Sequence, residues 1–361
     1  MTQGCVQLPT PARLREVSVT GKLERSMRII AATISPAVAR RISRALAEIL
    51  QWTVSSKWPE VAWSFSRLTG DGFPLEFTLS SLDATVRYTA EVAGPEVAEV
   101  ERLPRALELI DRLGGVLPAA HITRLLHQVQ AAGPLSYGAW IGGRHDNFRD
   151  RFKVYVEVPR TGMHEAQDLV REMIADQPLP NLSNPEFRLI GYEPGEKRFE
   201  CYFHVDRLEV WELERLMGQA GLAERHTSLL NMLAESYNRP VQSTIPDENL
   251  GFSFSYSLAG SPTVFSFFTY ARSVFGSDAK IRLRLLELGK AKGWNFQTYE
   301  QLTVPLAHRT SWKTRHGVVS FVVPPDGPLV LQIGLRPPET PSTLSHSEFT
   351  STRSEEANYE V

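Results

Sequence analysis

Strand-like segments that occur in pairs, with amphipathic helices between the pairs, are the feature that most constrains the fold of this chain. The strand-like segments alternate apolar and polar residues and are Trp63–Arg67, Phe73–Leu79, Thr85–Val92, Tyr137–Gly142, Phe152–Pro159, Phe187–Tyr192, Arg198–Val205, Gly251–Ser257, Val264–Arg272, Gly317–Val323 and Leu329–Leu335. Segments with apolar residues at helical spacing lie between them and are Val100–Leu113, Ile122–Val129, His164–Ile174, Val210–Met217, Leu229–Leu233 and Ala279–Leu288. Successive later pairs begin roughly 50 to 65 residues apart, which indicates two strands followed by helices, several times over.

The two faces of these strands differ in character. In the segment Arg198–His204 the apolar face is Phe199, Cys201 and Phe203, and the other face carries Arg198, Glu200, Tyr202 and His204. Successive side chains of a strand point to opposite faces, so helices can cover the apolar face while the polar faces gather elsewhere. An open sheet with its polar face in water fits this pattern. We favour a closed antiparallel β-barrel ringed by helices, whose lumen is lined with Arg, Lys, Glu and Tyr.

Composition excludes some classes of function. The 361 residues include 39 basic and 41 acidic side chains, and this balance argues against a protein that binds nucleic acid or a membrane surface through excess positive charge. Two cysteines, Cys5 and Cys201, are too few for a disulfide framework. We find no signal-peptide pattern and no apolar run long enough to span a bilayer, so we expect a cytoplasmic protein.

The chain divides into three regions. Residues 1–35 are weakly patterned and are expected to form an N-terminal arm on the surface. Residues 36–335 carry the alternating strands and helices. Residues 336–361 are rich in Pro, Ser, Thr and Glu, with too little apolar surface to offset the entropy of ordering, and we expect a disordered tail.

Several short motifs resemble those of the dimethylallyltryptophan synthase family of aromatic prenyltransferases. They are GFPLEFTLS at 72–80, TVRYTAEV at 85–92, FKVYVEVP at 152–159, KRFECYF at 197–203 and TVFSFFTYAR at 263–272. The resemblance covers roughly residues 36–335, and its first motif is the most specific. It implies five ββαα repeats closed into a ten-stranded barrel (the ABBA fold), a fold shared by the peptide prenyltransferases of cyanobactin pathways. It also implies metal-independent transfer of a prenyl group, dimethylallyl above all, from prenyl diphosphate to tryptophan or another indole in secondary metabolism.

The resemblance assigns roles to individual residues. It implies that Glu76 accepts the indole proton and that Arg87, Lys153 and Arg198 bind the diphosphate. Charge gathers on the departing diphosphate, so preplaced cations lower the barrier where that charge develops. Aromatic faces attract positive charge, and the residues expected to shield the allylic cation are Tyr155, Tyr202, Phe268 and Tyr270.

This sequence departs from the family pattern at four positions. Glu200 stands where the family has a lysine, and Ser266, Phe268 and Val318 stand where it has residues that complete the tyrosine shield. The aspartate-rich DDxxD motif of metal-dependent enzymes is absent, and we interpret Asp146 and Asp150 as ordinary loop aspartates. We therefore expect no cofactor and no requirement for Mg²⁺.

Other functions stay open. A peptide side chain could be the acceptor, as in the cyanobactin enzymes, and a wide mouth would favour that. A diverged barrel could bind an apolar molecule without catalysis, which would be favoured if the cations were paired with Glu91, Glu157 and Glu200. An open α+β scaffold for protein contacts would leave the charged faces in solvent.

Overall fold

Ten strands form the centre of the protein in a computed structural model that describes residues 20–55, 66–83, 85–174, 185–258 and 263–337. They are β1 (Leu75–Ser80), β2 (Val86–Glu91), β3 (Ala139–His145), β4 (Asp150–Glu157), β5 (Glu186–Glu193), β6 (Arg198–Val205), β7 (Leu250–Ser257), β8 (Val264–Tyr270), β9 (His316–Val323) and β10 (Val330–Leu335). Most of the further strand expected at Trp63–Arg67 lies outside the described residues, and Ser66 and Arg67 belong to no strand.

The sheet closes on itself. Neighbouring strands pair antiparallel in chain order, and β1 then pairs with β10 through Phe77 opposite Leu335 and Thr78 opposite Gly334. Closure removes the two free edges that an open sheet would expose. The expected closed, ten-stranded antiparallel barrel is confirmed, and the open-sheet alternative is wrong.

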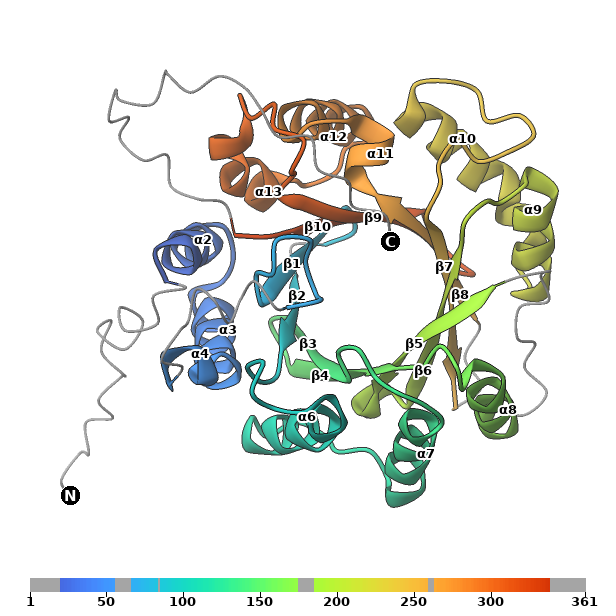
Figure 1. The fold of residues 1–361 in the computed structure, drawn as a ribbon. Coiled ribbons are helices and arrows are strands. Elements are labelled where there is room, and N and C mark those ends of the chain that lie inside the picture. Colours follow the sequence, from blue (N-terminus) through green and yellow to red (C-terminus); the bar gives the residue numbers. More distant parts are fainter. Residues whose placement is uncertain (1–19, 56–65, 84, 175–184, 259–262, 338–361) are drawn as a thin grey trace, which may run out of the picture.

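Helices surround the barrel on its outside, as Figure 1 shows in a view down the barrel. They are α2 (Thr20–Thr33), α3 (Pro36–Ile49), α4 (Gln51–Ser55), α6 (Arg102–Arg112), α7 (Ala120–Ala131), α8 (Met163–Ile174), α9 (Val210–Gln219), α10 (His226–Tyr237), α11 (Ala271–Phe275), α12 (Asp278–Lys292) and α13 (Gln297–Leu302). No described helix follows β10. The first helices, α2 to α4, close the ring between α13 and α6 in its place.

The N-terminal region is more ordered than the sequence indicated. Residues 20–33, which we assigned to an arm, form α2 and bury Leu23, Met27 and Ile30. Their spacing of four and three residues places these side chains on one helical face, which packs on the protein. The remainder of the expected arm, residues 1–19, lies outside the described residues.

The apolar faces of the strands form one layer with the helices. In β6 every second residue is buried, and Phe199, Cys201 and Phe203 lie on the covered side. Phe252 and Phe254 of β7 continue this layer, with ring centroids 5.3 Å apart between Phe203 and Phe252. This layer holds the core, so the lumen is left to the polar faces.

Two carboxylates at strand ends attach the barrel strands to the helix and the connecting segments beside them. Glu91 pairs with Arg102 of α6 at 2.8 Å and also accepts a hydrogen bond from Ser66. Glu157 accepts hydrogen bonds from the backbone N–H groups of Ser136, Tyr137 and Gly138. Neither carboxylate is therefore a partner for the cations of the lumen.

The chain beyond β10 remains attached to the barrel for at least one residue. Arg336 is buried and pairs with Asp71 at 2.5 Å, so the expected disordered tail does not begin at residue 336. Residues 338–361 lie outside the described residues. Among the described helices, none is both long and apolar enough to cross a membrane.

The Glu91–Arg102 pair gives a test of the fold. We expect Arg102→Met to lower the free energy of unfolding by roughly 3–5 kcal/mol, because it leaves Glu91 charged and unpaired in a buried position. Arg105→Met, on the same helix, removes an exposed pair with Glu108 and should cost less than about 1 kcal/mol. Urea unfolding of both variants measures the difference, and equal midpoints would contradict this account.

Candidate active site in the barrel lumen

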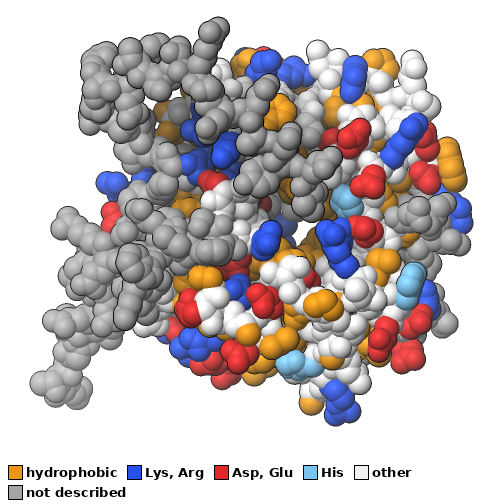
Figure 2. All heavy atoms as spheres, in the orientation of Figure 1, with side chains coloured by type: hydrophobic (Ala, Val, Ile, Leu, Met, Phe, Trp, Pro, Cys, Tyr) orange, Lys and Arg blue, Asp and Glu red, His pale blue; other side chains and the backbone are white. Residues whose placement is uncertain are grey.

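A cavity of about 440 Å³ occupies the barrel lumen, and all ten strands contribute residues to its lining. It extends from the end where hairpins join the strands, near Glu193 and Glu196, inward to Thr89, Lys153 and Phe268. Figure 2 shows a hollow near the centre of this face, with basic side chains at its edge.

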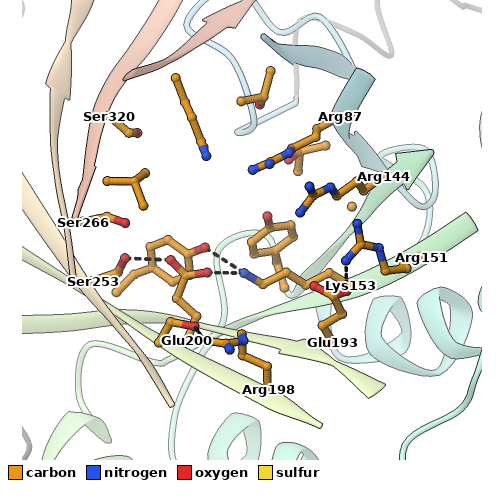
Figure 3. Close-up of a pocket in the computed structure, with 18 of the residues that line it drawn as sticks. Arg87, Arg144, Arg151, Lys153, Glu193, Arg198, Glu200, Ser253, Ser266 and Ser320 are labelled. Atoms are coloured by element: carbon orange, nitrogen blue, oxygen red, sulfur yellow. Dashed lines mark hydrogen bonds and ion pairs between the residues drawn. The ribbon is translucent and has the colours of Figure 1, made fainter. Parts of the chain in front are cut away.

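One wall of the cavity is basic. Arg87 of β2 lies opposite Arg144 of β3, and Arg144 lies opposite Arg151 of β4. These three residues, here called the arginine row, all line the cavity, as Figure 3 shows. Burial and the positive charge of Arg144 lower the pKa of Arg87 to about 10.

Two cations of the lining carry no counter-ion. In the part of the chain that is described, neither Arg87 nor Arg198 takes part in an ion pair. Arg198 donates a hydrogen bond of 3.1 Å to Ser255. Uncompensated guanidinium groups in a cavity attract anions with several oxygen atoms, since their fixed donors match such oxygens in pairs.

Lys153 is in a different state, because a carboxylate neutralises it. Its Nζ donates hydrogen bonds to Glu200 and, at 3.0 Å, to Tyr202. Ser253 donates to the other oxygen of Glu200 at 2.7 Å. Although burial acts in the opposite direction on each, the pair raises the pKa of Lys153 and lowers that of Glu200. Both groups therefore stay charged at neutral pH.

Three aromatic rings lie in the middle of the cavity. The centroid of Tyr202 is 6.1 Å from that of Tyr155 and 6.1 Å from that of Phe268. The Lys153 ammonium already lies 4.9 Å from the Tyr155 centroid and 5.3 Å from the Tyr202 centroid. These ring faces are thus placed where a cation can be stabilised.

The wall opposite the arginine row carries hydroxyl groups. Ser253 and Ser255 of β7, Ser266 of β8 and Ser320 of β9 line it, together with Gln332 of β10. Small neutral donors of this kind enlarge the cavity and offer hydrogen bonds without adding charge.

Glu76 lies just beyond the cavity. Its neighbours Thr78 and Thr89 line the cavity, whereas Glu76 is not among the described lining residues. Its carboxylate lies against Gly317 and Gly334, where a side chain would collide with its oxygen atoms. Burial raises the pKa of Glu76 to about 7, and the nearby Arg336 limits that rise.

The structure brings together six of the eight site residues expected from the sequence. Those that line the cavity are Arg87, Lys153, Arg198, Tyr155, Tyr202 and Phe268. Tyr270 does not lie with them. It is the last residue of β8, is 47% exposed and has the Arg272 guanidinium 5.6 Å from its ring centroid. We expected Tyr270 in the shield of the allylic cation. The structure does not support this, because β8 ends at Tyr270 and the residue does not line the cavity.

Two arginines of the cavity were missed. We expected the third and fourth strands to span Tyr137–Gly142 and Phe152–Pro159, but they extend to His145 and begin at Asp150. Arg144 lies two residues after Gly142, and Arg151 lies two residues before Lys153. Alternation would have placed both in the lumen had the strands been drawn to their full length.

Asp146, in the loop between β3 and β4, and Asp150, the first residue of β4, both have structural partners. Asp146 pairs with Arg151 at 3.2 Å, and Asp150 pairs with Arg41 at 2.8 Å and contacts His145 at 2.8 Å. In the described part of the chain, no three His, Cys, Asp or Glu side chains come together as metal ligands would.

Comparison with known proteins links this architecture to one group of enzymes. Neither a protein-family model nor a curated protein matches the sequence. Among solved structures, 5-dimethylallyl tryptophan synthase from Streptomyces coelicolor in complex with DMASPP and Trp is 17% identical, with a TM-score of 0.71, over 91% of this chain and 98% of its own. AnaPT from Neosartorya fischeri is 15% identical, with a TM-score of 0.66, over 92% and 95% of the two chains.

A third similar structure is the complex of the prenyltransferase PriB with product diphosphate. It is 18% identical, with a TM-score of 0.69, and the match covers 89% of this chain and 95% of PriB. At these levels of identity the likeness concerns the fold. The chain has the barrel fold of the dimethylallyl tryptophan synthases and of the prenyltransferase PriB.

Proposed function

We propose that this protein transfers a prenyl group, dimethylallyl above all, from prenyl diphosphate to an aromatic acceptor of the indole type. The observation that carries the proposal is a single barrel cavity with unpaired guanidinium groups at one end and three aromatic rings in the middle. An anion with an allylic tail matches both parts.

The donor would lie with its diphosphate toward Arg87 and its hydrocarbon toward the rings. When the bond between the allylic carbon and the diphosphate oxygen breaks, the leaving group takes the electron pair and gains negative charge. The cations of the basic wall stabilise that charge without reorganising, because they are already in place. We therefore propose a reaction that depends on no metal ion, with side-chain cations in that role.

The allylic cation would be held by Tyr155, Tyr202 and Phe268 until the acceptor attacks it. Related structures are described as complexes with tryptophan, which supports an indole acceptor. As the bond to the acceptor forms, the indole loses a proton, and Glu76 is the carboxylate beyond the inner end of the cavity. With a pKa of about 7 it can accept that proton near neutral pH.

A second candidate is a barrel that binds an apolar molecule without ionising a diphosphate. The Lys153–Glu200 pair favours it, since one expected diphosphate ligand is neutralised. The free cations Arg87 and Arg198 favour the enzyme. We also propose a cytoplasmic location, which the free thiol of buried Cys201 supports.

Product formation tests the proposal directly. Purified protein incubated with EDTA, dimethylallyl diphosphate and tryptophan, indole dipeptides or tyrosine should add one C5H8 unit to an indole compound, detected by mass spectrometry. Arg87→Gln should lower the rate about 10²–10³-fold, because one preplaced donor to the leaving group is lost.

The outcomes separate the candidates. Arg105→Gln, on the outer face of α6, is the matched control and should react like the wild type. Transfer only to a peptide residue would select the cyanobactin-like alternative. No product from C5, C10 or C15 donors with a folded protein would refute the proposal and favour the binding barrel.

Glu76 gives a separate prediction on pH. Its pKa is raised from 4.5 to about 7, so between these values the folded protein keeps a proton that the unfolded chain has released. Ionising Glu76 therefore lowers the free energy of unfolding increasingly as pH rises through this range, by roughly 3 kcal/mol above it. Glu76→Gln removes that cost and should unfold at higher urea than the wild type at about pH 8, but not near pH 4.5.

The same variant should be a poor enzyme. Activity of the wild type should rise with pH to a plateau above about 7, as Glu76 loses its proton. Glu76→Gln should lack this rise and be about 10²–10⁴-fold slower. A stabilised variant that keeps full activity and the same pH profile would remove Glu76 from the mechanism.

A further inference from the structure

We propose that the arginine row of Arg87, Arg144 and Arg151 is the diphosphate cradle of this barrel, with Arg144 and Arg151 in place of the neutralised Lys153. The inference rests on the proposed function, because it names the residues that hold the donor's anionic end. It differs from the site that the sequence motifs imply, in which Lys153 and Arg198 accompany Arg87.

The first argument is the register of the strands. Arg87 and Arg144 are direct cross-strand partners, as are Arg144 and Arg151, so three like charges stand side by side on one face. Adjacent strands lie about 4.8 Å apart, and like charges placed directly opposite each other destabilise a sheet. Arg144 and Arg151 have carboxylate partners, but Arg87 has none in the described chain, and an anion in front of the row would supply it.

The second argument is a set of unsatisfied donors. The Nε atoms of Arg87, Arg144 and Arg151 are all buried, and none has a hydrogen-bond partner among the residues the structure describes. A buried donor without a partner costs about 1–3 kcal/mol. The three arginines stand on neighbouring strands and line one cavity, which indicates a ligand with several acceptor oxygens.

The third argument concerns where the counter-charges lie. Asp83 pairs with Arg144 at 3.2 Å, and Arg151 pairs with Asp146 at 3.2 Å, Glu196 at 3.4 Å and Glu193 at 3.9 Å. Asp83, Asp146 and Glu196 come from the hairpin loops at the rim, and Glu193 is the last residue of β5; Glu193 and Glu196 also line the cavity. Arg87, labelled in Figure 3, has no such partner in the described chain.

The fourth argument is the state of Lys153. It is bound by Glu200 and Tyr202, and Glu200 is bound in turn by Ser253. Moving Lys153 to a diphosphate would leave Glu200 charged and unpaired inside the barrel, which is strongly unfavourable. Glu200 would also repel the diphosphate directly. Both effects keep the anion at the hairpin end, on the arginine row.

Pyrophosphate binding tests this assignment without any need for turnover. By titration calorimetry on the full chain, we expect Arg144→Gln and Arg151→Gln each to weaken the binding of inorganic pyrophosphate about tenfold, as each removes a charged donor to the anion. The matched control is Arg149→Gln on the same hairpin, which lies outside the cavity, is 56% exposed and should bind within about twofold of wild type. Glu200→Gln should tighten binding, because it releases Lys153 and removes a repulsive charge.

The outcomes distinguish this inference from the proposed function. Undiminished pyrophosphate binding in Arg144→Gln and Arg151→Gln, in protein shown to be folded by circular dichroism, would overturn the cradle. Weaker binding in Glu200→Gln, or no binding to the wild type, would do the same. Tight binding on the row with no prenylated product would sustain the cradle and refute the enzyme. Normal product from both arginine variants would sustain the enzyme and refute the cradle.

Discussion

The pairing of β1 with β10 is the interaction on which the rest of this structure depends. It joins the first and last strands of the sheet through Phe77, Thr78 and Leu79 opposite Leu335, Gly334 and Ile333. Once the sheet is closed, the strands have one outer face and one inner face, and the helices take the outer one. Every polar side chain of the inner face must then find its partners inside the lumen, where an unpaired charge is costly.

This confinement explains how the charged groups are distributed around the lumen. Carboxylates near strand ends bind groups outside the lumen. Glu91 pairs with Arg102, and Glu157 accepts hydrogen bonds from the backbone before β3. Lys153 and Glu200 neutralise each other in the middle. The cations of the lining without a carboxylate partner in the described chain are Arg87 on β2 and Arg198 on β6, and the wall formed by β2 to β4 also carries Arg144 and Arg151. Arginines are therefore concentrated at the hairpin end of the cavity, which is where an anionic ligand is best stabilised.

Much of this could be predicted from the sequence, because alternation in a strand is a local property. It placed Lys153 and Tyr155 on the same face of one strand, and Arg198 and Tyr202 on the same face of another strand. Six of the expected site residues line the cavity. What failed was the extent of the strands: Arg144 and Arg151 were missed by two residues at each side of a hairpin, and Tyr270 lies at the strand end. Strand ends are set by tertiary pairing, which local pattern does not contain.

The partner of Glu200 shows a second limit of the sequence. Arg198 lies two residues away on the same face of β6, yet Glu200 binds Lys153 of β4, with β5 between them. Gly191 of β5 lies opposite Glu200, and any side chain there would collide with the end of Lys153. The missing side chain lets the lysine cross β5 to reach the carboxylate.

Other long side chains around the cavity also lie against a glycine of a neighbouring strand. Tyr155 lies over Gly142, Phe268 over Gly251, and the Glu76 carboxylate over Gly334. A narrow barrel has little room for a long side chain on every strand at one level, and these groups are accommodated by a glycine on a neighbouring strand. A larger residue at any of these glycines would displace the functional group and leave the outer core unchanged. The inward glycines therefore determine, as much as the charged residues do, what this lumen can hold.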